Sequence, residues 1–275
     1  MDCPLCESPS NFVFPAKGIN VRDCDVCDHR FAQLDPDEDH VKSVYDDGYF
    51  KGGGAGYPDY SAEADLLIKR GRMYADRIKQ YTAPGKMLDV GAACGYVLRG
   101  FLDRGWKGIG LEPNEAMVRI AREKTRLAVL QGTLESLVSE GTFDLITMIQ
   151  VVGHFYDPAK AFRIAHGLLN DGGLMLIEAW NRESFSARVF GKRWHEYSPP
   201  SVRQWYSTDS LTGLLESIGF ERIAGGRPPK HISGGHAKSL LKYHVGKTRL
   251  FDIIPDKVTI PYPAGDLFWQ LYRKR

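Results

Sequence analysis

The chain has 275 residues, enough for one α/β domain of ordinary size and a small additional module. Hydrophobic residues make up 43% of it and charged residues 25%, which excludes a disordered chain. The formal net charge of +2 excludes a strong field for nucleic acid over the whole chain, although residues 35–47 are acidic and residues 227–249 are basic. No apolar run reaches the roughly 18 residues of a membrane span, so we expect no membrane insertion. The first residues lack the pattern of a signal peptide, which predicts a cytoplasmic protein.

Four of the five cysteines form two CxxC pairs near the start of the chain. Cys3 and Cys6 are separated from Cys24 and Cys27 by residues 7–23, which are polar with few apolar members. Two such pairs suit a tetrahedral thiolate site for structural Zn²⁺, because a two-residue spacing lets both sulfurs reach one ion. Redox-active disulfides are the alternative. Four protein ligands would close the site, which favours a structural metal over a catalytic one.

A glycine turn follows the first predicted strand of the larger domain. Asp89 lies in that strand, Gly91 and Gly95 lie in the turn, and Glu112 ends the next predicted strand. A glycine turn followed by an acid about 20 residues later is typical of doubly wound cofactor sites, because glycine admits the ligand and the acid binds ribose hydroxyls. A tight structural turn is the alternative. A dinucleotide fingerprint requires a different glycine spacing, and Asp89 would repel a pyrophosphate, so the charges favour S-adenosylmethionine over NAD.

These residues resemble the first motif of the class I methyltransferases, Asp/Glu-x-Gly-x-x-x-Gly. The resemblance extends over roughly residues 85–225 and departs from the family at Ala93, where a further glycine is usual. It implies S-adenosyl-L-methionine as methyl donor and S-adenosyl-L-homocysteine as product. The residues it implies for cofactor binding are Asp89, Gly91, Ala92, Gly95, Glu112, Pro113, Thr133, Leu134 and Gln150.

The resemblance also implies an α/β fold with a seven-stranded Rossmann-like sheet of order 3-2-1-4-5-7-6, its last strand antiparallel. A small module resembling a zinc ribbon precedes it. We expect the zinc-binding knot at residues 1–34, a lid and helical segment at 35–82, and the methyltransferase domain at 83–275, with a substrate-loop insertion at about 180–206. The expected strands are 87–90, 106–112, 127–130, 143–149, 174–179, 220–224 and 266–272.

A closer resemblance links the chain to bacterial methyltransferases that carry a leading CxxC…CxxC segment. The shared features are Tyr45-Asp46-Asp47-Gly48-Tyr49-Phe50 and the later Pro199-Pro200…Trp205-Tyr206-Ser207. Many such enzymes act on sugars, cell-envelope precursors or secondary metabolites, so the resemblance implies a small polar acceptor. The glycines of residues 52–56 predict a hinge for a lid that carries the tyrosines.

Methyl transfer requires alignment of donor and acceptor, and a general base assists when the acceptor must lose a proton. The candidate catalytic residues are His154, His195, Tyr197 and Tyr49. Each is also compatible with ordinary packing or capping. The fifth cysteine, Cys94, is interpreted as a small loop residue, with a catalytic thiol as the alternative.

Two other functions stay open at this point. An rRNA or tRNA methyltransferase would use the knot for RNA recognition, supported by Lys230, Lys238, Lys242, Lys247 and Arg249. The acidic residues after Cys27 argue against it, so nucleic acid is an unfavoured but open partner. A non-catalytic zinc-bearing scaffold is the second alternative. The sequence does not indicate an oligomeric state.

Overall fold

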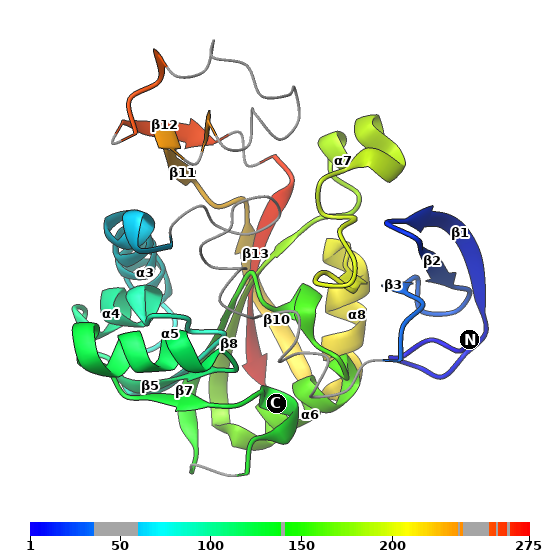
Figure 1. Cartoon of the computed structure of the whole chain (residues 1–275). Helices are drawn as coiled ribbons and strands as arrows, with labels where there is room; N and C mark the ends of the chain where they lie inside the picture. The colour runs from blue at the N-terminus through cyan, green and yellow to red at the C-terminus, as the bar shows by residue number, and fades with distance from the viewer. Residues whose placement is uncertain (36–59, 139–140, 236, 239–252, 257, 263–264) are drawn as a thin grey trace.

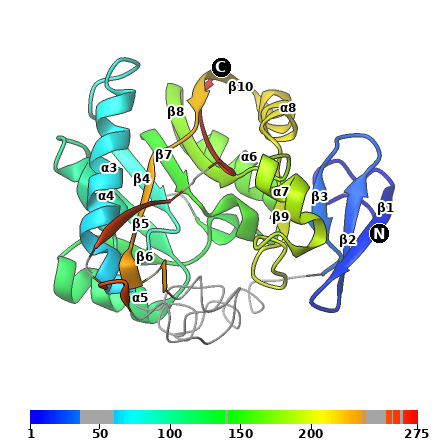
Figure 2. The ribbon, with the colours of Figure 1, turned by 90° about the horizontal axis from the view of Figure 1, so that it is seen from above.

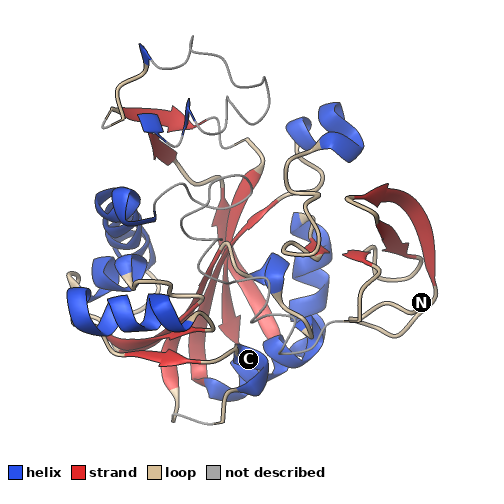
Figure 3. Cartoon of the chain, in the orientation of Figure 1, coloured by secondary structure: helices blue, strands red, loops and turns tan. Residues whose placement is uncertain are grey.

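The computed structural model describes residues 1–35, 60–138, 141–235, 237–238, 253–256, 258–262 and 265–275. Tyr45, Tyr49 and the glycines of residues 52–56 lie outside this part, as do Lys242, Lys247 and Arg249. Within the described part, no helix is both long and apolar enough to cross a membrane. Figure 3 shows helices on both sides of a central sheet and a separate group of strands near the N-terminus.

The central sheet has seven strands in the order β10-β13-β8-β7-β4-β5-β6. Counted along the chain from β4, this is the predicted order 3-2-1-4-5-7-6. The last strand, β13, runs antiparallel to both of its neighbours, also as predicted. The strands are β4 (Lys86–Val90), β5 (Lys107–Glu112), β6 (Val129–Gln131), β7 (Phe143–Ile149), β8 (Leu169–Trp180), β10 (Phe220–Gly226) and β13 (Leu267–Lys274).

Helices cover both faces of the sheet, because successive residues of each strand point to opposite faces. In β7, Leu145 packs with the helices α3 and α4, while Ile146 packs with α6 and α8. Figure 1 shows these two layers on either side of the strands. The helices are α3 (Ala64–Ile78), α4 (Tyr96–Leu102), α5 (Glu115–Ile120), α6 (Pro158–Leu168), α7 (Phe185–Phe190) and α8 (Thr208–Ile218).

Polar caps fix where the helices after the strands begin. Asn114 accepts a hydrogen bond from the Met117 backbone at the start of α5. Asp157 accepts a hydrogen bond from the Lys160 backbone in the same way at the start of α6, whose first residue is Pro158. Such caps pair backbone N–H groups that have no partner within the helix, and proline is tolerated there because its missing N–H would be unpaired anyway.

Two strands begin more than one residue away from the predicted start. The third strand begins at Val129 and not at Leu127, because a π-helical turn continues α5 to Thr125 and Arg126 then adopts a left-handed conformation. The fifth strand extends back to Leu169, whereas we expected it to begin at Leu174. Helix propensity and turn residues alone do not determine such boundaries, since pairing with a neighbouring strand overrides them.

The N-terminal residues form a second sheet that incorporates part of the larger domain. Its order is β1-β2-β3-β9, with β1 (Ser10–Ala16), β2 (Ile19–Cys24), β3 (Arg30–Ala32) and β9 (Gln204–Trp205). In the antiparallel pairing of β3 with β9, Arg30 lies opposite Trp205 and Phe31 lies opposite Gln204. Figure 2 shows β3 beside β9 at the edge of the larger domain. A short hairpin of β11 (Lys230–Ser233) and β12 (Thr259–Tyr262) completes the described strands.

Candidate active site

The glycine turn after β4 has the backbone conformation that its glycines permit. Gly91 and Gly95 have φ angles of +70° and +78°. A Cβ atom on Gly91 would lie 2.8 Å from Val151, and one on Gly95 would lie 2.5 Å from Leu127. Ala93 also lies in the left-handed region, with φ of +46°, and thus keeps the conformation that a glycine there would favour. Although alanine replaces the glycine that is usual in the motif, this position keeps its left-handed backbone conformation.

Glu112 holds this turn against the end of β5. Its carboxylate accepts hydrogen bonds from the backbone N–H groups of Ala93 and Asn114, each at 2.9 Å. The side chain is almost fully buried, and burial raises its pKa to about 7. Glu112 thus holds the turn in place through these hydrogen bonds. It also lies at the end of β5, where the resemblance implies that the ribose binds.

Asp89 lies beneath the same turn. Its Oδ1 accepts a hydrogen bond from the Thr147 hydroxyl at 2.6 Å, whereas its Oδ2 is buried with no hydrogen-bond partner in the structure. Burial raises its pKa to about 7. Within the described residues, neither Asp89 nor Glu112 forms a salt bridge. Two buried carboxyls without a cation suit a ligand that brings positive charge.

The other residues predicted for the cofactor lie around the same strand ends. Thr133 and Leu134 are buried after β6, and the Thr133 hydroxyl bonds to that of Ser136 at 2.9 Å. Ala92 is buried and donates its N–H to the Leu111 carbonyl, and Pro113 follows Glu112 directly. The structure therefore brings these residues together around the glycine turn.

Glu178 is a buried acid at the end of β8 that we did not predict. Its carboxylate accepts a hydrogen bond from the Gln150 amide at 2.7 Å and from the Tyr74 hydroxyl, and it pairs with Arg70 at 3.3 Å. Gln150 itself is held at φ of +57°. A charged residue within the apolar run of residues 174–179 was the available sequence signal, because buried acids require partners.

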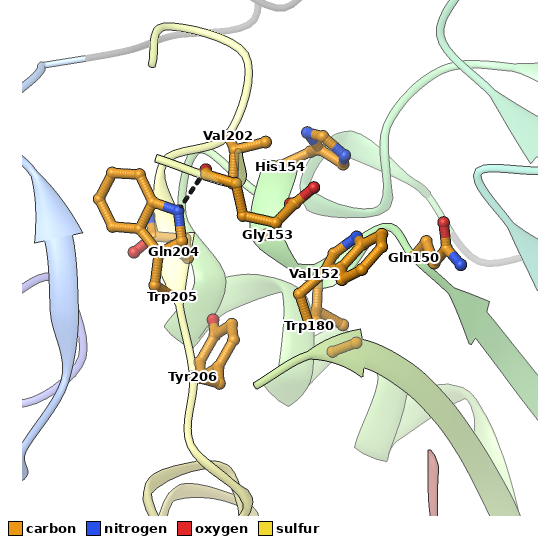
Figure 4. Close-up of a pocket in the computed structure, with 11 residues that line it drawn as sticks. Gln150, Val152, Gly153, His154, Trp180, Val202, Gln204, Trp205 and Tyr206 are labelled. Atoms are coloured by element: carbon orange, nitrogen blue, oxygen red, sulfur yellow. Dashed lines mark hydrogen bonds between the residues drawn. The ribbon is translucent and has the colours of Figure 1, made fainter. Parts of the chain in front are cut away.

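A pocket lies beyond the carboxyl ends of β7 and β8. Figure 4 shows Trp205 and Tyr206 on one side of it and His154, Trp180 and Gln150 on the other. Its lining combines apolar side chains with several polar groups. The lining residues are Gln150, Val152, Gly153, His154, Ala179, Trp180, Glu196, Val202, Gln204, Trp205 and Tyr206.

The candidate catalytic residue His154 lines this pocket. Its Nδ1 donates a hydrogen bond to the Ser201 carbonyl at 2.9 Å, and the Arg203 guanidinium donates to its backbone carbonyl. Burial lowers the pKa of the ring to about 4, an effect that the positive charge of Arg203 reinforces. His154 is therefore neutral near pH 7 and is a weak proton acceptor.

The remaining catalytic candidates lie in different surroundings. The His195 Nε2 lies 3.5 Å from the carboxylate of Glu196, a pocket residue, and its ring packs edge-on against Trp180. Tyr197 is buried at the contact with the N-terminal sheet, where its hydroxyl accepts a hydrogen bond from Arg30 at 2.6 Å. It is absent from the pocket lining, so its surroundings favour a packing role.

The fifth cysteine, Cys94, is buried, and its sulfur lies 3.3 Å from that of Met117. Burial raises the pKa of the thiol to about 11, which keeps it in the unreactive thiol form near pH 7. These surroundings favour the small loop residue over the catalytic thiol.

The four cysteines of the two CxxC pairs come together in the N-terminal module. The sulfurs of Cys3, Cys6, Cys24 and Cys27 all lie within 4.8 Å of one another. The Cys6 sulfur lies 3.4 Å from those of both Cys24 and Cys27. A Zn²⁺ ion with four Zn–S bonds of about 2.3 Å would space its sulfurs by about 3.8 Å, so the donor set fits that ion.

The backbone of each CxxC pair supports the same interpretation. The N–H of Leu5 points to the Cys3 sulfur, and the N–H groups of Val26 and Cys27 point to the Cys24 sulfur, each at 3.4 Å. Such donors offset thiolate charge around a metal.

Comparisons with known proteins find methyltransferases. A family model described as a methyltransferase domain matches residues 66–224, more than half of the chain. A ubiquinone biosynthesis O-methyltransferase of Dinoroseobacter shibae is 30% identical over 150 residues, which cover 50% of this chain and 60% of the relative. A probable S-adenosylmethionine-dependent methyltransferase of Mycolicibacterium smegmatis is 28% identical over 162 residues, covering 58% of this chain and 61% of the relative. The chain thus spans about three fifths of the length of these curated relatives.

Solved structures show the same fold. A putative methyltransferase from Bacillus halodurans superposes with a TM-score of 0.55 at 18% identity, covering 74% of this chain and 98% of that one. An S-adenosylmethionine-dependent methyltransferase from Archaeoglobus fulgidus gives a TM-score of 0.52 at 17% identity, with 77% and 94% covered. Together with the glycine turn and the strand order, the family match shows that the chain belongs to the methyltransferase domain family.

Proposed function

We propose that the enzyme methylates a hydroxyl group of a small molecule held in the pocket beyond β7 and β8. The observation that carries the proposal is the lining, in which the half-buried ring of Trp180 lies with the polar groups of Gln150 and His154. Sugars, cell-envelope precursors and secondary metabolites with a ring all suit such a lining. The relatives named as ubiquinone biosynthesis O-methyltransferases support oxygen as the methylated atom.

The glycine turn and the two buried acids would hold the methyl donor. S-adenosylmethionine supplies an electrophilic methyl group on a positively charged sulfonium. The orphaned Oδ2 of Asp89 and the raised pKa values of Asp89 and Glu112 fit a cationic ligand. We assign Glu112 to the ribose and the turn at residues 91–95 to the amino-acid part of the donor. Gln150, fixed by Glu178, lies between this region and the pocket.

We assign the role of general base to His195 with its neighbour Glu196. When the acceptor oxygen forms its bond to the methyl group, its proton must pass to a base. The His195 Nε2 lies 3.5 Å from the Glu196 carboxylate, and Glu196 lines the pocket. His154 suits this role less well, because burial lowers its pKa to about 4, and we assign it to positioning the loop that forms the pocket.

We propose that the four-cysteine cluster holds structural Zn²⁺, which would support membership of the subgroup with a leading CxxC…CxxC segment. With four sulfur ligands, such an ion would have no open position for a substrate. Its contribution would be to fold the N-terminal strands, whose apolar core is small.

A methyl-transfer screen with labelled S-adenosylmethionine tests the proposal. Sugars, lipid precursors and phenolic metabolites form one set, and bulk RNA forms the other. We expect label in a small hydroxylated acceptor. Label in RNA alone would instead support the RNA methyltransferase, and no binding of S-adenosylmethionine by calorimetry would support a non-catalytic scaffold.

Two histidine variants then test the assignment of the base. His195→Gln is expected to lower kcat by about 10²- to 10⁴-fold while S-adenosylmethionine affinity is unchanged, because only proton acceptance is lost. His231→Gln is the matched control, since His231 is exposed on β11. A larger loss in His154→Gln than in His195→Gln would show that the base is wrongly assigned.

A further inference from the structure

One short helix exposes three large apolar side chains. In α7, Phe185 is 82% exposed, and Val189 and Phe190 are each 61% exposed. Single apolar residues on a surface are ordinary, but a cluster of three on one element indicates a contact surface. Figure 1 shows α7 projecting above α8, at the end of the molecule away from the C-terminus.

The outward direction of these side chains is fixed by the other side of the helix. Ser184 caps α7 by accepting a hydrogen bond from the Ala187 backbone at 3.1 Å. Ala187 is buried in a cluster with Trp194, Tyr197 and Trp205. Because this inner face is occupied, Phe185 and its two apolar neighbours remain outside the core.

Cations surround the apolar side chains. Arg188 lies within α7, and Lys192 and Arg193 lie in the 3₁₀ turn that follows; all three are exposed. Within the described part of the chain, none of them forms a salt bridge. The one acid of the segment, Glu183, lies 3.9 Å from Arg182. The surface therefore combines exposed hydrocarbon with positive charge that no acid among the described residues pairs.

We propose that α7 and the turn Gly191–Arg193 dock the enzyme on an anionic lipid surface. Apolar side chains partition into the boundary between headgroups and acyl chains, while lysine and arginine remain with anionic headgroups. This is peripheral binding and requires no spanning helix.

A lipid surface suits these residues better than a protein partner does. A symmetric contact with a second copy would bring Arg188, Lys192 and Arg193 of both copies together, and like charges repel. A stable protein interface also buries about 800 Å² on each partner, more than one helix of six residues offers. A bilayer needs no complementary shape.

The docking surface is continuous with the pocket. The chain leads from α7 through Trp194 to Glu196, and then to the wall formed by Gln204 and Trp205. A docked enzyme would thus hold its pocket near the bilayer, where an amphiphilic acceptor resides. This second step rests on the proposed function, whereas docking itself does not.

Sedimentation of the full chain with lipid vesicles tests the docking without measuring activity. We expect binding to mixed phosphatidylcholine and phosphatidylglycerol vesicles, weak binding to phosphatidylcholine alone, and loss of binding at high salt. Phe185→Ser combined with Phe190→Ser is expected to weaken vesicle binding at least about tenfold. Lys192→Gln combined with Arg193→Gln is expected to weaken it about tenfold and to reduce its salt dependence.

Matched variants elsewhere control for general effects. Phe12→Ser removes a phenylalanine that is 55% exposed on β1, and Lys160→Gln with Arg163→Gln removes two exposed cations of α6; both should leave vesicle binding unchanged. Failure to bind anionic vesicles, or full binding by the double phenylalanine variant, would overturn the proposal. So would a dimer in gel filtration that Phe185→Ser dissociates, because self-association would then account for the surface. Thermal unfolding confirms that each variant is folded.

Discussion

Ala93 occupies a backbone conformation that costs free energy for any residue with a Cβ atom. Its φ of +46° lies between the two glycines of the turn, and its N–H is held by Glu112. The left-handed region costs an L-residue about 1 to 2 kcal/mol, whereas glycine enters it readily. The turn thus retains strain at a functional position, as many active sites do.

Ala93→Gly is therefore expected to stabilise the protein by up to about 1 kcal/mol. The release of strain exceeds the added chain entropy of the unfolded state, which costs about 0.4 to 1 kcal/mol. Urea unfolding measures the difference, and Ala92→Gly, at a neighbouring position without positive φ, should destabilise. Equal losses in the free energy of unfolding in both variants would contradict backbone strain at Ala93.

Among the elements, β9 connects the N-terminal module to the pocket. His29 lies 2.7 Å from the Gln204 side-chain oxygen, and the Gln204 amide donates to the Phe155 carbonyl at 3.2 Å. Burial lowers the pKa of His29 to about 4, so the ring is neutral and donates its single N–H to Gln204. One chain of hydrogen bonds thus leads from the cysteine cluster to the loop after β7.

Loss of the proposed metal should therefore loosen the pocket wall. Cys24→Ser is expected to release zinc and to raise amide exchange at residues 204–206 by about tenfold or more, because β3 would no longer be held beside β9. Exchange in α4 should stay unchanged. Cys94→Ser removes the buried cysteine outside the cluster and is the matched control. Unaltered amide exchange at residues 204–206 in Cys24→Ser would show that the cysteine cluster does not hold the pocket wall in place.

Local patterns predicted most of the central sheet but not its contact with the module. Residues 143–149 were predicted as a strand with the observed bounds, because their apolar run and flanking polar residues suffice. The pairing of Phe31 with Gln204 joins residues far apart in the chain and leaves no local pattern. For the same reason Tyr197 was predicted for the cleft, although Arg30 holds it at the module. Glu178 was missed because its partners Arg70 and Gln150 come from separate elements.

For the whole molecule, two buried acids near the active site make stability depend on pH. Asp89 has a pKa of about 7 in the folded protein against an ordinary 3.8, and Glu112 about 7 against 4.5. Between these values the folded state holds more protons than the unfolded state, so stability falls as pH rises from about 4 to about 7. Above about pH 7 both carboxyls are ionised in the folded and in the unfolded protein, so their titration no longer changes the stability.

The stabilisation by S-adenosylmethionine should have the opposite pH dependence. A cationic ligand favours the ionised acids, so the increase in Tm on adding it should be larger at about pH 8 than at about pH 5. Asp89→Asn should reduce that difference, and Asp209→Asn, an exposed acid of α8, should not. Thermal unfolding with and without the ligand measures both. An equal increase at the two pH values would contradict a charge-coupled site.

The sheet that pairs β3 with β9 also constrains the order of events during synthesis. His29 and Gln204 are 175 positions apart, and a ribosome adding about 5 to 20 residues per second needs roughly 10 to 35 s to cover that distance. During this interval β3 has β2 on one side and an open edge on the other. A cysteine cluster that captures its ion early would keep the three strands folded through this delay. The N-terminal module would then already be folded when β9 leaves the ribosome.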